Sequence, residues 1–105
     1  MNYCIILTLT SNFDEAKKIA HTLVTNKLAA CANIIPNVTS VYEWKGEICE
    51  DGEYLISIKT RKDKFDAVKK AILQNHSYEL PAILMLPIEA GLEGYLKWVD
   101  KNTGF

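Results

Sequence analysis

The sequence predicts an α+β domain in which a four-stranded antiparallel sheet carries two helices on one face. Short apolar or alternating runs, typical of strands, occupy residues 3–9, 38–44, 53–60 and 81–88. Amphipathic runs with helical spacing separate them, and a shorter one follows the last strand. The order strand, helix, two strands, helix, strand is the split βαβ arrangement of the ferredoxin-like fold. We expect a single domain over residues 1–105, with an extra C-terminal helix.

The first strand and the first helix lie in the N-terminal quarter of the chain. Tyr3 to Leu9 is apolar and too short for a helix of ordinary length, so it predicts a buried strand. Asn12 and Glu15 have the spacing of a capping box, which marks the start of a helix over about residues 13–27. The inner side of this helix is predicted to contain Ala16, Ile19, Ala20, Leu23 and Val24.

A long hairpin follows the first helix. Residues 38–44 and 53–60 alternate between two faces and are rich in aromatic and β-branched side chains, so both predict strands. Residues 45–47 are the expected turn between them. We expect the extended segment before the hairpin to break at Pro36, and residues 51–52 to form a bulge or a second bend.

The second half of the chain supplies a helix, a strand and a final helix. Residues 63–74 predict a helix because apolar side chains recur every three or four positions. Residues 81–88 are nearly all apolar, so we expect a strand that is covered on both faces. A short third helix is predicted from the spacing of Leu92, Tyr95, Leu96 and Val99.

This topology leaves one face of the sheet without cover. Right-handed crossovers place both long helices on the same side, while the strands at 3–9 and 81–88 carry apolar side chains on both sides. A large exposed apolar face is an interaction surface or an aggregation hazard. The hairpin, at about residues 34–60, is also too long to pack within a domain of this size. We therefore expect copies of the chain to associate and to pair edge strands.

Composition and charge argue against several classes of protein. The chain has 12 basic and 13 acidic residues, with a net charge of −1, so it lacks the basic stripe of a nucleic-acid-binding protein. The apolar run near the N-terminus is too short for a signal peptide or a membrane span, which predicts a cytoplasmic protein with no membrane partner. Three cysteines without C-x-x-C spacing predict reduced thiols.

The motifs of common enzymes are absent from the sequence. It contains no G-x-G-x-x-G, P-loop, H-E-x-x-H or G-x-S-x-G motif. Acylphosphatases share the expected topology, but residues 8–12 lack their glycine-rich anion-binding loop. RNA-binding domains need aromatic side chains on the central strands, and residues 3–7 and 54–58 do not supply that pattern. We expect no catalytic activity and no organic cofactor.

An ordered set of motifs resembles the CutA1 family of divalent-cation tolerance proteins. Residues 28–36, LAACANIIP, are similar to its LAAC-x-N-x-x-P segment. Residues 40–48, SVYEWKGEI, and 76–81, HSYELP, resemble its S-x-Y-x-W-x-G-x-I hairpin and its H-x-Y-E-x-P segment. The resemblance implies a tight homotrimer of ferredoxin-like subunits, with strands joined between subunits as in the similar PII signalling proteins. It also implies divalent-cation tolerance and copper binding, and no firm catalytic activity.

Cys31, His76 and Glu79 are the candidate metal ligands. The Cys31 thiolate suits Cu(I), although a small buried side chain among alanines is the alternative. His76 and Glu79 lie close together where a helix gives way to a strand; the alternative for His76 is a hydrogen bond to the backbone at the helix end. In some family members a copper site uses a thiol and a second histidine, where this chain has Thr8 and Asn75.

A second candidate site is a cleft between subunits, formed by Lys59 and Arg61 together with Tyr78 and Glu79. Such a cleft would hold a small anion, as in PII-like sensors. The alternative is an ion pair between strands or between subunits.

Three aromatic side chains are expected at the trimer interface: Tyr42, Trp44 and Trp98. The sequence thus predicts a homotrimeric protein that binds copper or another divalent metal ion and takes part in the response to metal ions. Two alternatives stay open, a sensor of a small anionic ligand at the intersubunit cleft and a purely structural trimeric scaffold.

Overall fold

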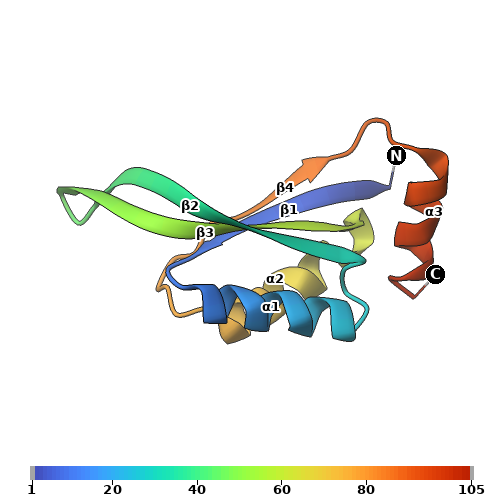
Figure 1. Cartoon of the computed structure of the whole chain (residues 1–105), viewed down its shortest axis with the longest axis horizontal. Coiled ribbons are helices and arrows are strands. Elements are labelled where there is room, and N and C mark those ends of the chain that lie inside the picture. The colour runs from blue at the N-terminus through green and yellow to red at the C-terminus, as the bar shows by residue number, and fades with distance from the viewer. Residues whose placement is uncertain (1, 105) are drawn as a thin grey trace.

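The chain folds into a four-stranded antiparallel sheet with two helices packed against one face (Figure 1). The structure, a computed structural model, describes residues 2–104; Met1 and Phe105, the ends of the expected domain, lie outside the described residues. The elements are β1 (Tyr3–Thr10), α1 (Phe13–Thr25), β2 (Cys31–Trp44), β3 (Glu47–Arg61), the 3-10 turn η1 (Lys62–Lys64), α2 (Phe65–Asn75), β4 (Ile83–Pro87) and α3 (Glu93–Lys101). The sheet order β2-β3-β1-β4 confirms the predicted ferredoxin-like topology and its extra C-terminal helix.

The hydrophobic core lies between the sheet and helices α1 and α2. Alternation along each strand sends every second side chain to this side, so Cys4 and Ile6 of β1 are fully buried beside Ile56 and Ile58 of β3. The helices contribute a matching apolar side, consisting of Ala16, Ile19 and Leu23 from α1 and Val68 and Ile72 from α2. No helix within residues 2–104 is long and apolar enough to cross a membrane.

Helix α1 begins where the capping pair predicts and ends slightly earlier than expected. The Asn12 side chain accepts a 2.8 Å hydrogen bond from the backbone N–H of Glu15, which satisfies one donor of the first turn. The helix ends at Thr25. Lys27 adopts a φ of 57°, which a helix cannot continue through, so the predicted end at residue 27 is two residues too late.

The hairpin turn is formed by the two residues that separate β2 from β3. Lys45 and Gly46 both have positive φ angles, 51° and 82°, as a two-residue type I′ turn requires. The pairing of Trp44 with Glu47 closes the turn and confirms its predicted position.

The irregularity in the hairpin falls at Pro36, where the sequence predicts a break, and not at residues 51–52 of the opposite strand. Strand β2 continues through Pro36, and the register shifts between Ile35 and Val38. Residues 51–52 pair regularly with residues 39–40, so the bulge predicted there is wrong. Pro36 offers no N–H to the ladder and Asn37 has a φ of 63°, which explains why the extra residue of the bulge falls at this point.

The sheet side that faces away from α1 and α2 is largely apolar, and we call it the open face. Leu84 and Leu86 of the edge strand β4 pair with Leu7 and Ile5 of β1 and share this side. Leu84 is 60% exposed and Leu86 is 45% exposed, so a single chain does not provide the expected cover over β4. The hairpin also extends far beyond the end of β1 (Figure 1), because β3 pairs with β1 only from Tyr54 onward.

Candidate functional site

A cavity of about 550 Å³ lies between the extended hairpin and the segment that follows α2. We call it the hairpin groove. Its walls include the rings of Tyr42, Trp44 and Tyr78 and the carboxylates of Glu53 and Glu79. The groove therefore combines aromatic surface with negative charge at the junction of two segments that are distant in the sequence.

Two tyrosine–carboxylate hydrogen bonds organise the groove. The Tyr78 hydroxyl donates to Oε2 of Glu53 at 2.6 Å, and the Tyr42 hydroxyl donates to Oδ2 of Asp51. Burial and the bond to Glu53 raise the pKa of Tyr78, while the bond to Asp51 and burial raise the pKa of Tyr42 to about 12. Both phenols consequently stay protonated near neutral pH and act as donors to the carboxylates.

His76 fixes the backbone of the segment that carries Tyr78. Its Nε2 lies 2.6 Å from the carbonyl oxygen of Leu9, and its Nδ1 lies 3.1 Å from the backbone N–H of Tyr78. A carbonyl only accepts and an N–H only donates, so this geometry assigns the proton to Nε2 and the lone pair to Nδ1. Both ring nitrogens of His76 are thus engaged inside the chain, which matches the predicted alternative of hydrogen bonds to the backbone.

Helix α1 holds the same segment from the other side. The Glu15 carboxylate accepts hydrogen bonds from the backbone N–H of Ser77 at 2.6 Å and from its hydroxyl at 3.1 Å. Glu15 and His76 together anchor the two residues before Tyr78, so the groove wall is held in place by contacts with β1 and α1.

One chain does not bring the three candidate metal ligands together. Cys31 pairs with Lys59 at one end of the sheet and lies beside Tyr95 of α3, whose pKa is raised by burial and by that thiol. His76 contacts Leu9, and Leu9 pairs with Leu55 of β3. Leu55 lies four residues before Lys59, a separation of about 13 Å at the rise of a strand. Within residues 2–104, no group of three or more His, Cys, Asp or Glu side chains is placed to hold a metal ion. A copper site is therefore a poor fit to the residues of a single copy.

Thr8 and Asn75, the positions that the sequence resemblance associates with copper ligands, do not form a site either. Thr8 is fully buried, and its hydroxyl has no hydrogen-bond partner among the described residues. The Asn75 side chain donates to the carbonyl oxygen of Ala71 at 2.8 Å. Neither side chain is available to a metal ion in this conformation.

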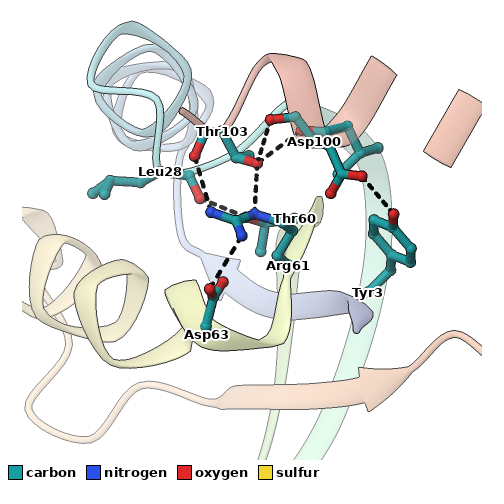
Figure 2. Close-up of polar contacts among 8 residues, drawn as sticks. Tyr3, Leu28, Thr60, Arg61, Asp63, Asp100 and Thr103 are labelled. Carbon is teal, nitrogen blue, oxygen red and sulfur yellow. Dashed lines mark hydrogen bonds and ion pairs between the residues drawn. The ribbon is translucent and has the colours of Figure 1, made fainter. Parts of the chain in front are cut away.

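Arg61 docks the C-terminal helix (Figure 2), and it is not among the described residues that line the hairpin groove. Its guanidinium is buried, donates to the hydroxyl and the carbonyl oxygen of Thr103 at 3.0 and 3.2 Å, and pairs with Asp63 at 3.1 Å. In the same figure the Tyr3 hydroxyl donates to Asp100 of α3 at 2.7 Å. These contacts hold α3 against the end of the sheet.

The predicted anion cleft is accordingly not assembled within one chain. The Lys59 ammonium donates to the side-chain oxygen of Asn33. Lys59 lies six residues along β3 from Glu53, the residue to which Tyr78 bonds. Arg61 lies further along in the same direction. A cleft containing all four residues would require more than one copy, and it stays a prediction.

The aromatic residues expected at the trimer interface are accessible in a single chain. Tyr42, Trp44 and Trp98 are 42%, 39% and 43% exposed. Two of them line the hairpin groove, while Trp98 lies on α3 with its ring 5.4 Å from that of Tyr95. Their contact with neighbouring copies stays a prediction.

Sequence reasoning missed Glu53 as a member of the site. Glu53 lies on β3, pairs with Val38 and is only 7% exposed. The sequence did contain an indication of its role, because Glu53 is a charged side chain on the strand face that also carries the apolar Leu55. Its bond to Tyr78 could not be anticipated, since the strand alternation places Glu53 on a face without saying which loop covers it.

Comparison with known proteins gives consistent results. The family model described as "CutA1 divalent ion tolerance protein" matches residues 4–102. The chain is 52% identical to "Protein CutA homolog" of Xenopus laevis over 84% of this chain and 58% of that protein. It is 41% identical to "Divalent-cation tolerance protein CutA" of Thermus thermophilus over 99% of this chain and 100% of that protein. The chain spans little more than half the length of its frog and plant relatives.

The fold is also similar to that of solved proteins. The structure called "Divalent cation tolerance protein (Cut A1)" from Thermus thermophilus superimposes with a TM-score of 0.94 at 40% identity. The match covers 97% of this chain and 99% of that one.

Proposed function

This chain belongs to the CutA1 family of divalent ion tolerance proteins, and from this premise we propose that it acts as a homotrimer in the response to divalent metal ions. We propose a role in binding and assembly, without catalytic turnover. The observation that carries the proposal is the open face, on which the apolar side chains of β4 meet water in a single chain.

The open face supports association because its exposed side chains are contiguous. Leu84 and Leu86 lie beside Leu7 and Ile5, and Ile35 of β2, 44% exposed, extends the apolar surface on the same side. Burying apolar area of this kind contributes about 25 cal/mol per Å². The strand edges of β2 and β4 are also free to pair with another copy, since both are edges of the sheet.

Metal binding is proposed for the assembly and not for the single chain. Cys31 lies apart from His76 and Glu79 within one copy, and both nitrogens of His76 are engaged. We therefore propose that copper or another divalent ion is held by groups from more than one copy. When bound, such an ion would supply charge and ligand bridging between subunits.

The alternative of an anion sensor has little support from the geometry. The groove is lined by the carboxylates of Glu53 and Glu79, while Lys59 and Arg61 lie toward the other end of the sheet. Negative charge at the site opposes the binding of a small anion. A purely structural trimeric scaffold remains the alternative that a failure of metal binding would favour.

Calorimetric titration with Cu(II) and Zn(II) tests the proposal. We expect the wild-type trimer to bind at least one of these ions, and Leu84→Asp, which places a charge on the open face, to abolish assembly and weaken binding at least about tenfold. Leu73→Asp is the matched control, because Leu73 is an exposed leucine on α2. Equal metal affinity in a dissociated Leu84→Asp variant would show that the site belongs to a single chain.

A further inference from the structure

Glu53 is a nearly buried carboxylate without a basic partner in the part of the chain that the structure describes. It is 7% exposed and accepts one hydrogen bond, from the neutral Tyr78 hydroxyl. The ion pairs of the described residues join Arg61 to Asp63, Lys69 to Asp66 and Lys97 to Glu93, and none involves Glu53. Buried charges in proteins are normally paired, because desolvation otherwise costs several kcal/mol.

The surroundings of Glu53 add negative charge instead of compensating it. Asp51 is close enough to contribute, with Glu53, to raising the pKa values of both Tyr42 and Tyr78. Glu79 lines the same groove, and no Lys, Arg or His is among its described lining residues. The site therefore attracts a positive charge from outside the chain.

The walls of the groove suit an organic cation. The rings of Tyr42, Trp44 and Tyr78 border a space of about 550 Å³, within the range of small-molecule sites. The Trp44 ring already accepts a cation, because the Lys45 ammonium lies 5.7 Å from its centre. Aromatic faces attract ammonium groups electrostatically, most strongly where water is excluded.

A bare metal ion fits this groove less well. Divalent metal ions in proteins take four or more ligands, with carboxylate, imidazole or thiolate donors close together. The described residues contain no group of three such donors. One or two carboxylates among aromatic rings instead resemble the sites that recognise alkylammonium groups.

One wall of the groove is also fixed in position by hydrogen bonds within the chain. His76 fixes the backbone N–H of Tyr78, and Glu15 fixes Ser77, so the wall that carries the Tyr78 ring is anchored at two points. Sites organised before binding lose less conformational entropy when the ligand enters.

We propose that the hairpin groove binds a small organic cation, an alkylammonium group whose charge pairs with Glu53 and whose methylene chain lies against Trp44 and Tyr42. This goes beyond the proposed role in the metal response, because it assigns a second class of ligand to a different set of residues. The ligand would sit beside the root of the hairpin, where it would stiffen the element that we expect to contact neighbouring copies.

Calorimetric titration with 1,4-diaminobutane tests the inference, with 1,4-butanediol as the neutral analogue of the same shape. We expect saturable binding of the diamine and none of the diol. Glu53→Gln keeps the shape of the side chain and an acceptor for Tyr78, and we expect it to weaken the diamine at least about tenfold. The matched control is Glu50→Gln, an exposed carboxylate on the same hairpin, which should change the affinity by less than about twofold.

Trp44→Leu provides a second variant, since Trp44 is 39% exposed and its loss should not prevent folding. We expect it to weaken the diamine several-fold by removing the aromatic wall. Light scattering on the same samples reports assembly separately from binding, so a failure of the trimer and a failure of the groove give different results.

Three outcomes would overturn the inference. They are a folded wild-type protein that does not bind the diamine, an affinity equal in wild type and Glu53→Gln, and equal binding of the diol.

Discussion

The hydroxyl of Tyr78 donates a 2.6 Å hydrogen bond to Oε2 of Glu53, which lies 25 residues earlier in the chain. This bond joins the segment after α2 to the root of the hairpin, and these two parts of the chain form opposite walls of the groove. This hydrogen bond therefore links the two walls directly, in addition to the contacts of His76 and Glu15 that anchor the segment after α2.

Tyr78→Phe removes this donor and leaves a nearly buried Glu53 oxygen without its partner. We expect the free energy of unfolding to fall by about 1–3 kcal/mol at pH 7. Urea unfolding followed by circular dichroism measures the change. Tyr54→Phe is a suitable control, because none of the described side-chain hydrogen bonds uses the Tyr54 hydroxyl.

The same bond predicts a pH dependence at alkaline pH. The pKa of Tyr78 in the folded protein is raised above the ordinary value of about 10 by burial and by Glu53. The unfolded chain consequently loses this proton first, so the stabilisation is complete below about pH 10 and is lost as pH rises through the folded pKa. We expect the difference in stability between wild type and Tyr78→Phe to shrink above about pH 10. A difference that stays constant up to the alkaline limit of folding would contradict this assignment.

Arg61→Met should detach the C-terminal helix from the sheet. The substitution keeps the aliphatic stem but removes the donors to Thr103 and the pairing with Asp63. Because the variant loses charge-assisted hydrogen bonds at a buried site, we expect its free energy of unfolding to fall by about 2–4 kcal/mol. Hydrogen exchange should also become faster in residues 93–101, and Lys62→Met, next in the sequence, should leave both measurements nearly unchanged.

Cys4 should resist thiol reagents in the folded protein. It is fully buried in the core, and burial raises the pKa of its thiol to about 11, so the reactive thiolate is scarce near neutral pH. Cys31 and Cys49 are only partly buried. Alkylation followed by mass spectrometry should modify Cys4 only after addition of denaturant. Rapid modification of Cys4 under native conditions would show that β1 opens readily.

Leu84→Asp should dissociate the assembly while leaving each chain folded. The side chain is 60% exposed on the open face, on the edge strand β4, so a charge there is tolerated by the monomer and is costly only at an interface. Circular dichroism should be unchanged, and light scattering should report a lower mass. If the variant keeps the wild-type mass, the open face is not the contact surface.

The parts of the fold that depend on local sequence could be predicted well. Alternation along β3 placed Tyr54, Ile56 and Ile58 on the core side, and the capping pair located the start of α1. The hairpin turn followed from a glycine where positive φ is needed. Each of these features is decided by residues that are neighbours in the chain.

The features that could not be predicted depend on contacts between distant segments or on cooperative backbone geometry. Pro36 indicates an interruption of the strand, but the sequence does not identify it as the bulge and favours residues 51–52, because a register shift depends on both partners in the ladder. Arg61 was expected in a ligand cleft, and its actual partner, Thr103, lies 42 residues away. The carboxylate of the groove, Glu53, was likewise missed, because the loop that reaches it is placed by His76 and Glu15.

The open face and the long hairpin need cover by neighbouring copies, and the proposed assembly depends on this need. Size-exclusion chromatography with light scattering at micromolar concentration tests this need most directly. We predict a single species with about three times the chain mass of 11.9 kDa. A folded and soluble species with the mass of one chain, stable at the same concentration, would contradict the account.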